Sequence, residues 1–181
     1  LWSVDLFRCE SATLNTCWVL VVLDQFTRRI IGFGIRRGDV DGPNLCRMFN
    51  RAISASGQPR SLSSDNDPLF NYHQWQANLR ILEIEEIKTV PYVPMSHPFV
   101  ERLIGTIRRE FLDNILFWTT NDLERKLSEF KDYYNHYRAH SALPRDAPAE
   151  LAGDVEIPKA VLADYLWKSH CRGLFHTPVA A

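Results

Sequence analysis

Apolar residues in the first forty positions form the short runs expected of β-strands. Three such runs cover residues 1–7, 17–26 and 29–35, with polar interruptions between them. Residues 25–28 suit a hairpin connection, so an antiparallel start to a sheet is predicted. Two further strands are predicted later in the chain, over 60–64 and 84–90.

Apolar positions in the rest of the chain recur mainly with the period of helices. Asp41 and Pro43 mark the start of one helix, and Gly57 and Pro59 end it. Other helices are predicted over 72–80, 99–115, 121–137 and, more weakly, 160–168. Asn121 and Glu124 resemble a capping box at the start of the helix predicted over 121–137. Prolines 91, 94 and 98 predict a loop.

The order of these elements predicts an α/β fold, with a five-stranded mixed sheet flanked by helices. The length of 181 residues suits one domain, or one domain with an appendage. We expect a core domain over 1–150 and a C-terminal extension of unknown role over 151–181.

The composition is that of a globular protein, with 45% hydrophobic and 24% charged residues. The longest apolar run, residues 18–23, is too short to cross a membrane, and the start of the chain has no signal-peptide pattern. A cytoplasmic location without a membrane partner is therefore expected. Because the first residue is Leu1 rather than Met, we expect a piece of a longer protein.

The net charge is −1, from 21 basic and 22 acidic residues, which argues weakly against a nucleic-acid partner. The four cysteines form no CxxC pair, so reduced thiols are expected. His170, Cys171 and His176 are close in sequence, but three candidate ligands in one segment indicate a metal site only weakly.

Three acidic residues occupy positions that a folded chain does not favour. Asp5 interrupts the first apolar strand, Asp65 follows the fourth strand, and Glu101 falls in the first turn of the long helix. Taken singly, Asp65 has an alternative role in a turn and Glu101 one in complementing the helix dipole. Taken together, the three carboxylates indicate a site for hard cations such as Mg²⁺.

These residues lie in segments that resemble a known family. Residues 2–5 (WSVD), 64–66 (SDN) and 99–102 (FVER), the last continuing to 106–110 (TIRRE), resemble in order the three motifs of DDE transposases and retroviral-type integrases, specifically those of bacterial insertion sequences. Between Asp65 and Glu101 lie 35 residues, the spacing of the D,D-35-E signature. The resemblance covers residues 1–150.

The resemblance implies a ribonuclease H-like fold and a DNA polynucleotidyl transferase that cuts transposon ends and joins them to target DNA. Asp5, Asp65 and Glu101 would be its catalytic residues and would bind two Mg²⁺ or Mn²⁺ ions. Arg108 lies seven residues after Glu101, an offset at which the family has a Lys or Arg that contacts DNA. Arg102 and Arg109 are expected to bind DNA as well. The family also implies a homo-oligomer on DNA and a place at the bacterial nucleoid.

A further match lies at residues 134–143, which resemble the YN-x-x-R-x-H-x-x-L tail of insertion-sequence transposases. Packing or DNA contact is the expected role of this tail. The chain departs from the family at Asp67, where many relatives have Gly, and an Asp can still adopt the positive φ expected there. It departs again in the 94–98 loop, and no region that reads transposon ends is apparent.

Two alternatives to an active transposase stay open. The chain could be a catalytically inactive remnant that binds DNA or assembles with other subunits, or a ribonuclease H-type hydrolase without strand transfer. Near-neutral charge does not exclude DNA, because two divalent ions would bring the net charge to about +3. Basic residues are also grouped, at 28–29, 36–37, 102 and 108–109, so weak and salt-sensitive DNA binding is expected.

Overall fold

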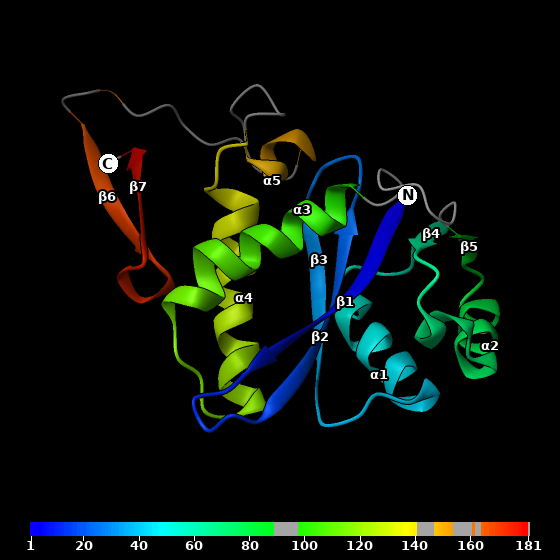
Figure 1. Ribbon diagram of the computed structural model, residues 1–181. Helices are drawn as coiled ribbons and strands as arrows, with labels where there is room; N and C mark the ends of the chain where they lie inside the picture. Colours follow the sequence, from blue (N-terminus) through cyan, green and yellow to red (C-terminus); the bar gives the residue numbers. More distant parts are fainter. Residues whose placement is uncertain (89–97, 141–146, 154–160, 162–163, 181) are drawn as a thin grey trace.

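A mixed sheet lies at the centre of the computed structural model, which describes residues 1–88, 98–140, 147–153, 161 and 164–180. The strand order is β3-β2-β1-β4-β5 (Figure 1). β1, β2 and β3 are antiparallel neighbours, whereas β4 is parallel to β1 and β5 is parallel to β4. The strands are β1 (Trp2–Glu10), β2 (Thr16–Asp24), β3 (Ile30–Arg37), β4 (Ser61–Ser64) and β5 (Glu85–Lys88).

The predicted five-stranded mixed sheet is thus confirmed. Four predicted features lie wholly or partly outside the described residues: the proline loop up to residue 97, the end of the fifth strand at 89–90, residues 141–143 of the tail motif, and residues 160 and 162–163 of the last predicted helix.

Helices cover both faces of this sheet (Figure 1). None of those described is both long and apolar enough to cross a bilayer. They are α1 (Gly42–Ile53), η1 (Pro68–Asn71), α2 (His73–Ile81), α3 (Pro98–Thr106), η2 (Ile107–Phe111), η3 (Leu112–Asn114), α4 (Thr120–His136), α5 (Pro148–Leu151) and η4 (Cys171–Gly173).

Alternation along the buried strand β2 divides the apolar residues into two cores. Val19, Val21 and Leu23 face a core shared with α3 and α4, and Leu20 and Val22 face one shared with α1 and α2. Because successive side chains of a strand point to opposite faces, one apolar run supplies both cores. The continuous hydrophobic pattern of this strand therefore has a direct structural cause.

Close backbone contact seats α1 on β3. A Cβ atom at Gly32 would lie 2.0 Å from the Ala52 carbonyl oxygen, and one at Gly34 would lie 2.3 Å from that of Met48. Only glycine permits this approach. The predicted start of α1 is confirmed, because Asp41 accepts a hydrogen bond from the backbone N–H of Asn44.

The long helix predicted from Phe99 to Ile115 is not a single α-helix. α3 ends at Thr106, and a π-helical turn and a short 3₁₀ turn follow. Within the wider π turn, Phe111 stacks on Phe130 and Glu110 forms a two-bond ion pair with Arg138. A π turn leaves apolar spacing nearly unchanged, so periodicity alone could not reveal it.

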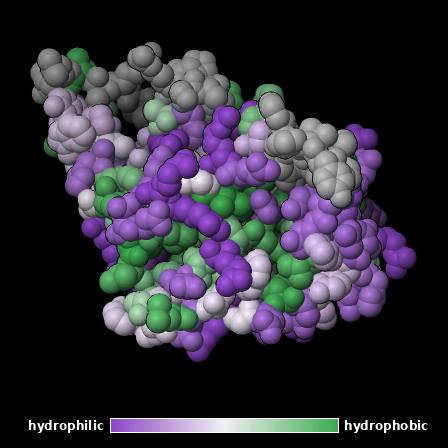
Figure 2. Space-filling view, in the orientation of Figure 1, coloured by the Kyte–Doolittle hydropathy of each residue, from purple (hydrophilic) through white to green (hydrophobic). Residues whose placement is uncertain are grey.

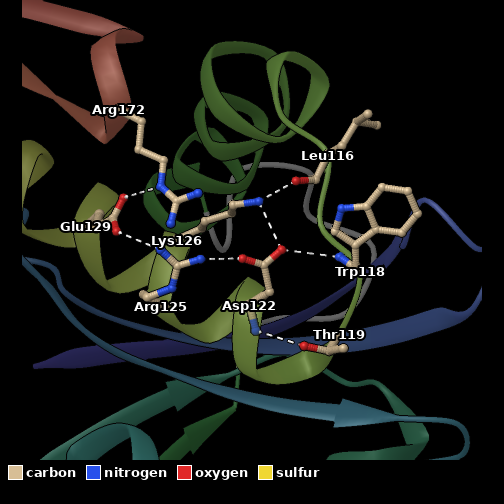
Figure 3. A network of polar contacts seen from close by, with 8 residues as sticks. All are labelled: Leu116, Trp118, Thr119, Asp122, Arg125, Lys126, Glu129 and Arg172. Atoms are coloured by element: carbon tan, nitrogen blue, oxygen red, sulfur yellow. Dashed lines mark hydrogen bonds and ion pairs between the residues drawn. The ribbon is translucent and has the colours of Figure 1, made fainter.

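The start of α4 differs from the predicted capping box at Asn121 and Glu124. Thr119 is the N-cap and accepts a hydrogen bond from the backbone N–H of Asp122 (Figure 3). The Asp122 carboxylate in turn accepts from the Trp118 N–H, Arg125 and Lys126. Acidic charge is favourable beside the exposed N–H groups of a helix start, so Asp122 stabilises this end.

The end of α4 is tied to the edge strand β3 by one buried side chain. Asn135 accepts a hydrogen bond from the Ile30 N–H at 2.9 Å and donates one to the Ile30 carbonyl at 3.0 Å. This pair lies beside a register shift between Val22 and Leu23 in β2. Asn135, Tyr134 and Arg138 of the tail motif all make packing or hydrogen-bond contacts within the domain, so packing, one of its two expected roles, is observed.

The predicted helix over 160–168 is wrong for its described part. Residues 165–168 belong to β6 (Tyr165–His170), which pairs with β7 (Phe175–Ala180) in a separate hairpin. Tyr133 of α4 stacks on Phe175 with ring centroids 4.2 Å apart. His170 bonds to Thr177, and no group of three metal-ligating residues occurs in the described ranges. All four cysteines are free, as expected.

Replacing Asn135 with Ala should destabilise the domain by about 2–4 kcal/mol, because it leaves the buried N–H and C=O of Ile30 without partners. Urea unfolding monitored by circular dichroism measures this loss. Asn50→Ala is the matched control, because Asn50 is exposed on α1 and bonds only to Asn78 among the described residues. Equal stability of the two variants would contradict the role of Asn135.

Candidate active site

Asp5 lies in the middle of β1, the central strand of the sheet. Phe7 and Cys9, at alternate positions from it, pack with the core under α3 and α4, so Asp5 lies on that same face. Its Oδ1 accepts a hydrogen bond from the Leu6 N–H. The carboxylate is therefore half-buried between the sheet and the helix that carries Glu101.

Asp65 directly follows β4, which is parallel to β1. The register pairs Trp2 with Leu62 and Ser3 with Ser63. Continued by two residues, it brings Asp65 level with Asp5 and onto the same face of the sheet. Parallel pairing thus brings together two acids that are 60 positions apart.

A tight turn holds Asp65 after the strand ends. Its Oδ1 accepts from the Asp67 N–H at 3.0 Å, and Asp67 caps the next 3₁₀ turn through the Leu69 N–H. Asp67 has a φ of −56°, so the positive φ expected at this position is wrong. The side-chain cap replaces the turn that a glycine would permit.

Glu101 is in the first turn of α3, at an exposed position. Val100 and Leu103 of the same helix are buried and pack α3 against β1 and β2. Burial of this face seats the helix that carries Glu101 over the strand that carries Asp5.

The electrostatics of Asp5 indicate how near these groups are. Burial raises the pKa of Asp5 to about 7, although the hydrogen bond from Leu6 opposes the increase. The negative charges of Asp65, Glu101 and Asp67 raise it further. Asp65 and Glu101 thus lie within electrostatic reach of Asp5, and each of them destabilises its ionised form.

The chemistry of this set fits a divalent cation better than it fits any other ligand. Carboxylate oxygens are the preferred ligands of Mg²⁺, and a cation would relieve the mutual repulsion at Asp5. Among the residues described, however, no three His, Cys, Asp or Glu side chains are already arranged around one metal position. The acids are gathered on one face, but they do not form a closed ligand set.

The predicted DNA-binding arginines lie at different places around α3. Arg108 donates to the Arg8 carbonyl and lies over the Phe7 ring, further along β1 than Asp5. The change from α- to π-helix at Ile107 interrupts the regular turn that would relate Arg108 to Glu101. Arg109 lies against Gly105, and the charge of Arg102 acts on Arg28 and Tyr134.

Sequence reasoning missed a partly buried polar network behind Asp65. The Glu86 carboxylate accepts hydrogen bonds from Ser64, Trp75 and Gln76, at 2.6, 2.9 and 2.6 Å. It also pairs with Lys88. Burial alone would raise the pKa of Glu86, but these four partners outweigh it and hold the pKa below its usual value.

Lys88 links this network to the candidate site. Its ammonium donates to the Asp65 carbonyl at 3.3 Å and to the Phe70 carbonyl at 3.0 Å. The network therefore holds both ends of the turn after β4. One indication of this network is present in the sequence: a glutamate, Glu86, lies within a short predicted strand that follows the helix with Trp75.

The surface around these elements is mainly polar, with smaller hydrophobic areas between the polar side chains (Figure 2). Hydrophobic side chains gather at the centre and at the left of this view, between the polar ones.

A sheet of this order, with the acids on β1, after β4 and in α3, defines a ribonuclease H-like catalytic core. The chain belongs to the Integrase core domain family: one Integrase core domain profile matches residues 1–94 and a second matches residues 82–148. It is a DDE transposase/integrase catalytic core.

Among curated proteins, it is similar to the Insertion element IS476 uncharacterized 39.2 kDa protein of Xanthomonas euvesicatoria, with 27% identity over 88% of the chain. It is also similar to the Insertion element IS407 uncharacterized 31.7 kDa protein of Burkholderia multivorans, with 27% identity over 84% of the chain. The chain spans only 46% and 54% of the lengths of these relatives.

Solved structures confirm the fold. A chain of the simian T-cell lymphotropic virus intasome in complex with PP2A regulatory subunit B56 gamma aligns with a TM-score of 0.71 and 20% identity. That alignment covers 99% of this chain and 66% of the other. The HTLV-2 integrase catalytic core domain in complex with magnesium (trimeric form) aligns with a TM-score of 0.61 and 17% identity, covering 83% of this chain and 93% of that one.

The raised pKa of Asp5 predicts a pH-dependent loss of stability in the absence of divalent metal. Between about pH 4 and pH 7 the unfolded chain ionises Asp5 and the folded chain does not, so stability falls as pH rises. Asp5→Asn should therefore be more stable than the wild type by about 2–4 kcal/mol above pH 7 and equal to it near pH 4.

Urea unfolding in EDTA across this pH range measures the difference. Asp39→Asn, at an exposed position after β3, is the matched control and should show no such trend. A constant offset between Asp5→Asn and the wild type at every pH would contradict the raised pKa.

Proposed function

We propose that this chain is the catalytic core of an insertion-sequence transposase that cuts DNA strands and joins them to a target. The observation that supports it most is the gathering of Asp5, Asp65 and Glu101 on one face, with the pKa of Asp5 raised to about 7. A carboxylate whose ionised form is disfavoured by burial and by neighbouring acids is suited to binding a cation.

In this proposal Asp5, Asp65 and Glu101 hold two Mg²⁺ or Mn²⁺ ions. When bound, such ions activate the attacking hydroxyl and stabilise the leaving oxygen of an in-line phosphoryl transfer. The residues of the chain supply the positioning: β1 and β4 hold the two aspartates side by side, and Lys88 fixes the Asp65 turn. Arg102, Arg108 and Arg109 contact the DNA backbone.

The names of the relatives support the DNA substrate. They include proteins of two insertion elements and the transposase for transposon Tn552 of Staphylococcus aureus, which is 21% identical over 71% of this chain. The magnesium in the HTLV-2 core structure supports the choice of metal. That core also has a dimeric and a trimeric form. We further propose that this chain acts as a homo-oligomer on paired DNA ends, in the bacterial cytoplasm at the nucleoid.

A joining assay tests the reaction. The protein is incubated with a duplex of the element's end that has a free 3′-hydroxyl, together with a plasmid target and Mg²⁺ or Mn²⁺. Joined product is expected from the wild type, and Asp65→Asn should reduce it about 100-fold or more, since a metal clamp contributes several kcal/mol. Asp39→Asn should retain full activity.

A Mn²⁺ titration followed by electron paramagnetic resonance tests the cation site separately. Asp65→Asn should weaken Mn²⁺ binding, and unchanged affinity would refute the proposed site. Hydrolysis of DNA without joined product would favour a ribonuclease H-type nuclease. DNA binding without metal binding or cleavage would favour the inactive remnant.

A further inference from the structure

An arginine in the β2–β3 turn adopts a backbone conformation that is unfavourable for its type. Arg28 has a φ of +64°, in the left-handed region that glycine occupies without strain. For other residues this conformation costs about 1 kcal/mol. The Arg28 N–H donates to the Asp24 carbonyl at 2.9 Å, and this hydrogen bond closes the turn. The Arg28 side chain is thus held at a place where a glycine would fold more easily.

The turn that carries Arg28 lies close to the candidate active site. The Gln25 N–H donates to the Leu1 carbonyl, and the Gln25 side chain donates to Ser3. Ser3 is two residues from Asp5 and therefore on the same face of β1. The side chain of Arg28 reaches α3, where its Cζ lies 3.3 Å from the centroid of the Phe99 ring.

A second arginine faces the same place from α3. Arg102 is three residues after Phe99, so the two side chains leave the same side of the helix. The positive charge of Arg102 adds to burial in lowering the pKa of Arg28. Both charges also act on Tyr134 of α4, which is buried beneath them. The two cations therefore lie close enough to repel each other.

Neither guanidinium forms an ion pair with a carboxylate in the part of the chain that the structure describes, although the charge of Asp24 favours the charged form of Arg28. Arg138, close by, shows the contrast, because it forms two hydrogen bonds to Glu110. One Arg28 nitrogen, Nη1, is buried without a hydrogen-bond partner among the described atoms. A partly buried cation such as Arg28 is costly without an ion pair, and an anion placed between it and the exposed Arg102 would offset that cost.

A third group with unused hydrogen-bonding capacity lies beside them. His140 is edge-on to Tyr134 with ring centroids 4.7 Å apart, and its Nε2 is buried without a described partner. Burial, together with the positive charge of Arg138, lowers the pKa of His140 to about 4. The ring is therefore neutral at physiological pH and adds no further positive charge to the pair.

We propose that Arg28 and Arg102 together bind one backbone phosphate of DNA beside the carboxylate site. The planar guanidinium group matches phosphate oxygens, and two of them facing one position favour a doubly contacted phosphate. Arg102 follows Glu101 on α3 and points about 100° around the helix from it, so the bound phosphate would be a different one from the reacting phosphate at the carboxylates. The choice of DNA as the source of the phosphate rests on the proposed function.

Binding of a fluorescent duplex oligonucleotide in EDTA tests this site without any cleavage. Arg28→Gln and Arg102→Gln should each weaken binding about 10-fold and lower the slope of log K against log salt by about 1. The double variant should lose less binding free energy than the sum of the losses of the two single variants, because both side chains hold one phosphate. Arg80→Gln, an exposed arginine in the last turn of α2, is the matched control and should bind like the wild type.

Arg28→Gly separates binding from folding. Glycine relieves the strain at φ +64°, so this variant should be at least as stable as the wild type. Its DNA binding should nevertheless be weaker than that of the wild type, because the guanidinium group is gone. Loss of stability together with normal DNA binding would show that Arg28 only packs on Phe99, and would overturn the proposal. Normal salt slopes for both Gln variants would overturn it as well.

Two further comparisons distinguish a DNA phosphate from free phosphate, and the phosphate site from the proposed catalysis. If inorganic phosphate stabilises the wild type more than Arg28→Gln, but both bind DNA equally, the pair is a free-phosphate site and the DNA assignment is wrong. If the arginine variants lose DNA binding while the wild type joins no DNA, the phosphate site stands and the proposed catalysis fails.

Discussion

Pairing of β1 with an antiparallel neighbour on one side and a parallel neighbour on the other is the constraint on which the rest of the structure depends. It places Asp5 in the interior of the sheet and brings Asp65 level with it. A shift of one residue in the β1–β4 register would turn Asp65 to the opposite face. Val4 and Leu62, buried in the core under α1, oppose such a shift. Apolar packing on one face thus fixes the acidic geometry on the other.

Burying Asp5 beside other acids costs folding free energy, and contacts elsewhere in the domain offset that cost. Half-burial of Asp5 among other acids disfavours folding without a cation, whereas Asn135 and Arg138 fasten α4 to β3 and to the π turn. The YN-x-x-R-x-H segment, which resembles a functional signature, accordingly acts within the described structure by holding α4 in place. Its described contacts are with β3, the π turn and the core under α3.

The strands and most helices could be predicted because alternation and the 3.6-residue period are local properties of the sequence. The three acids were predictable because each interrupts such a pattern or begins an element, and because they match a family motif. What failed depends on distant partners. β6 was taken for a helix because its partner strand lies at 175–180, and Glu86 was missed because its partners Ser64 and Trp75 come from two other elements.

Arg28 was noticed only as one member of a basic pair, because neither its left-handed backbone nor its approach to Phe99 can be read from local sequence. The position of Arg28 also bears on the net charge of −1, because it shows that local charges differ from the overall sum. Charges separated by more than about 10 Å are screened from each other at moderate salt, so DNA responds to local groups rather than to the sum. Here the acids gather on the β1 face, and the arginines lie around the helix and turn that border it. A nearly neutral chain can therefore present an attractive rim to a polyanion while it keeps, inside that rim, the negative potential that a divalent cation needs.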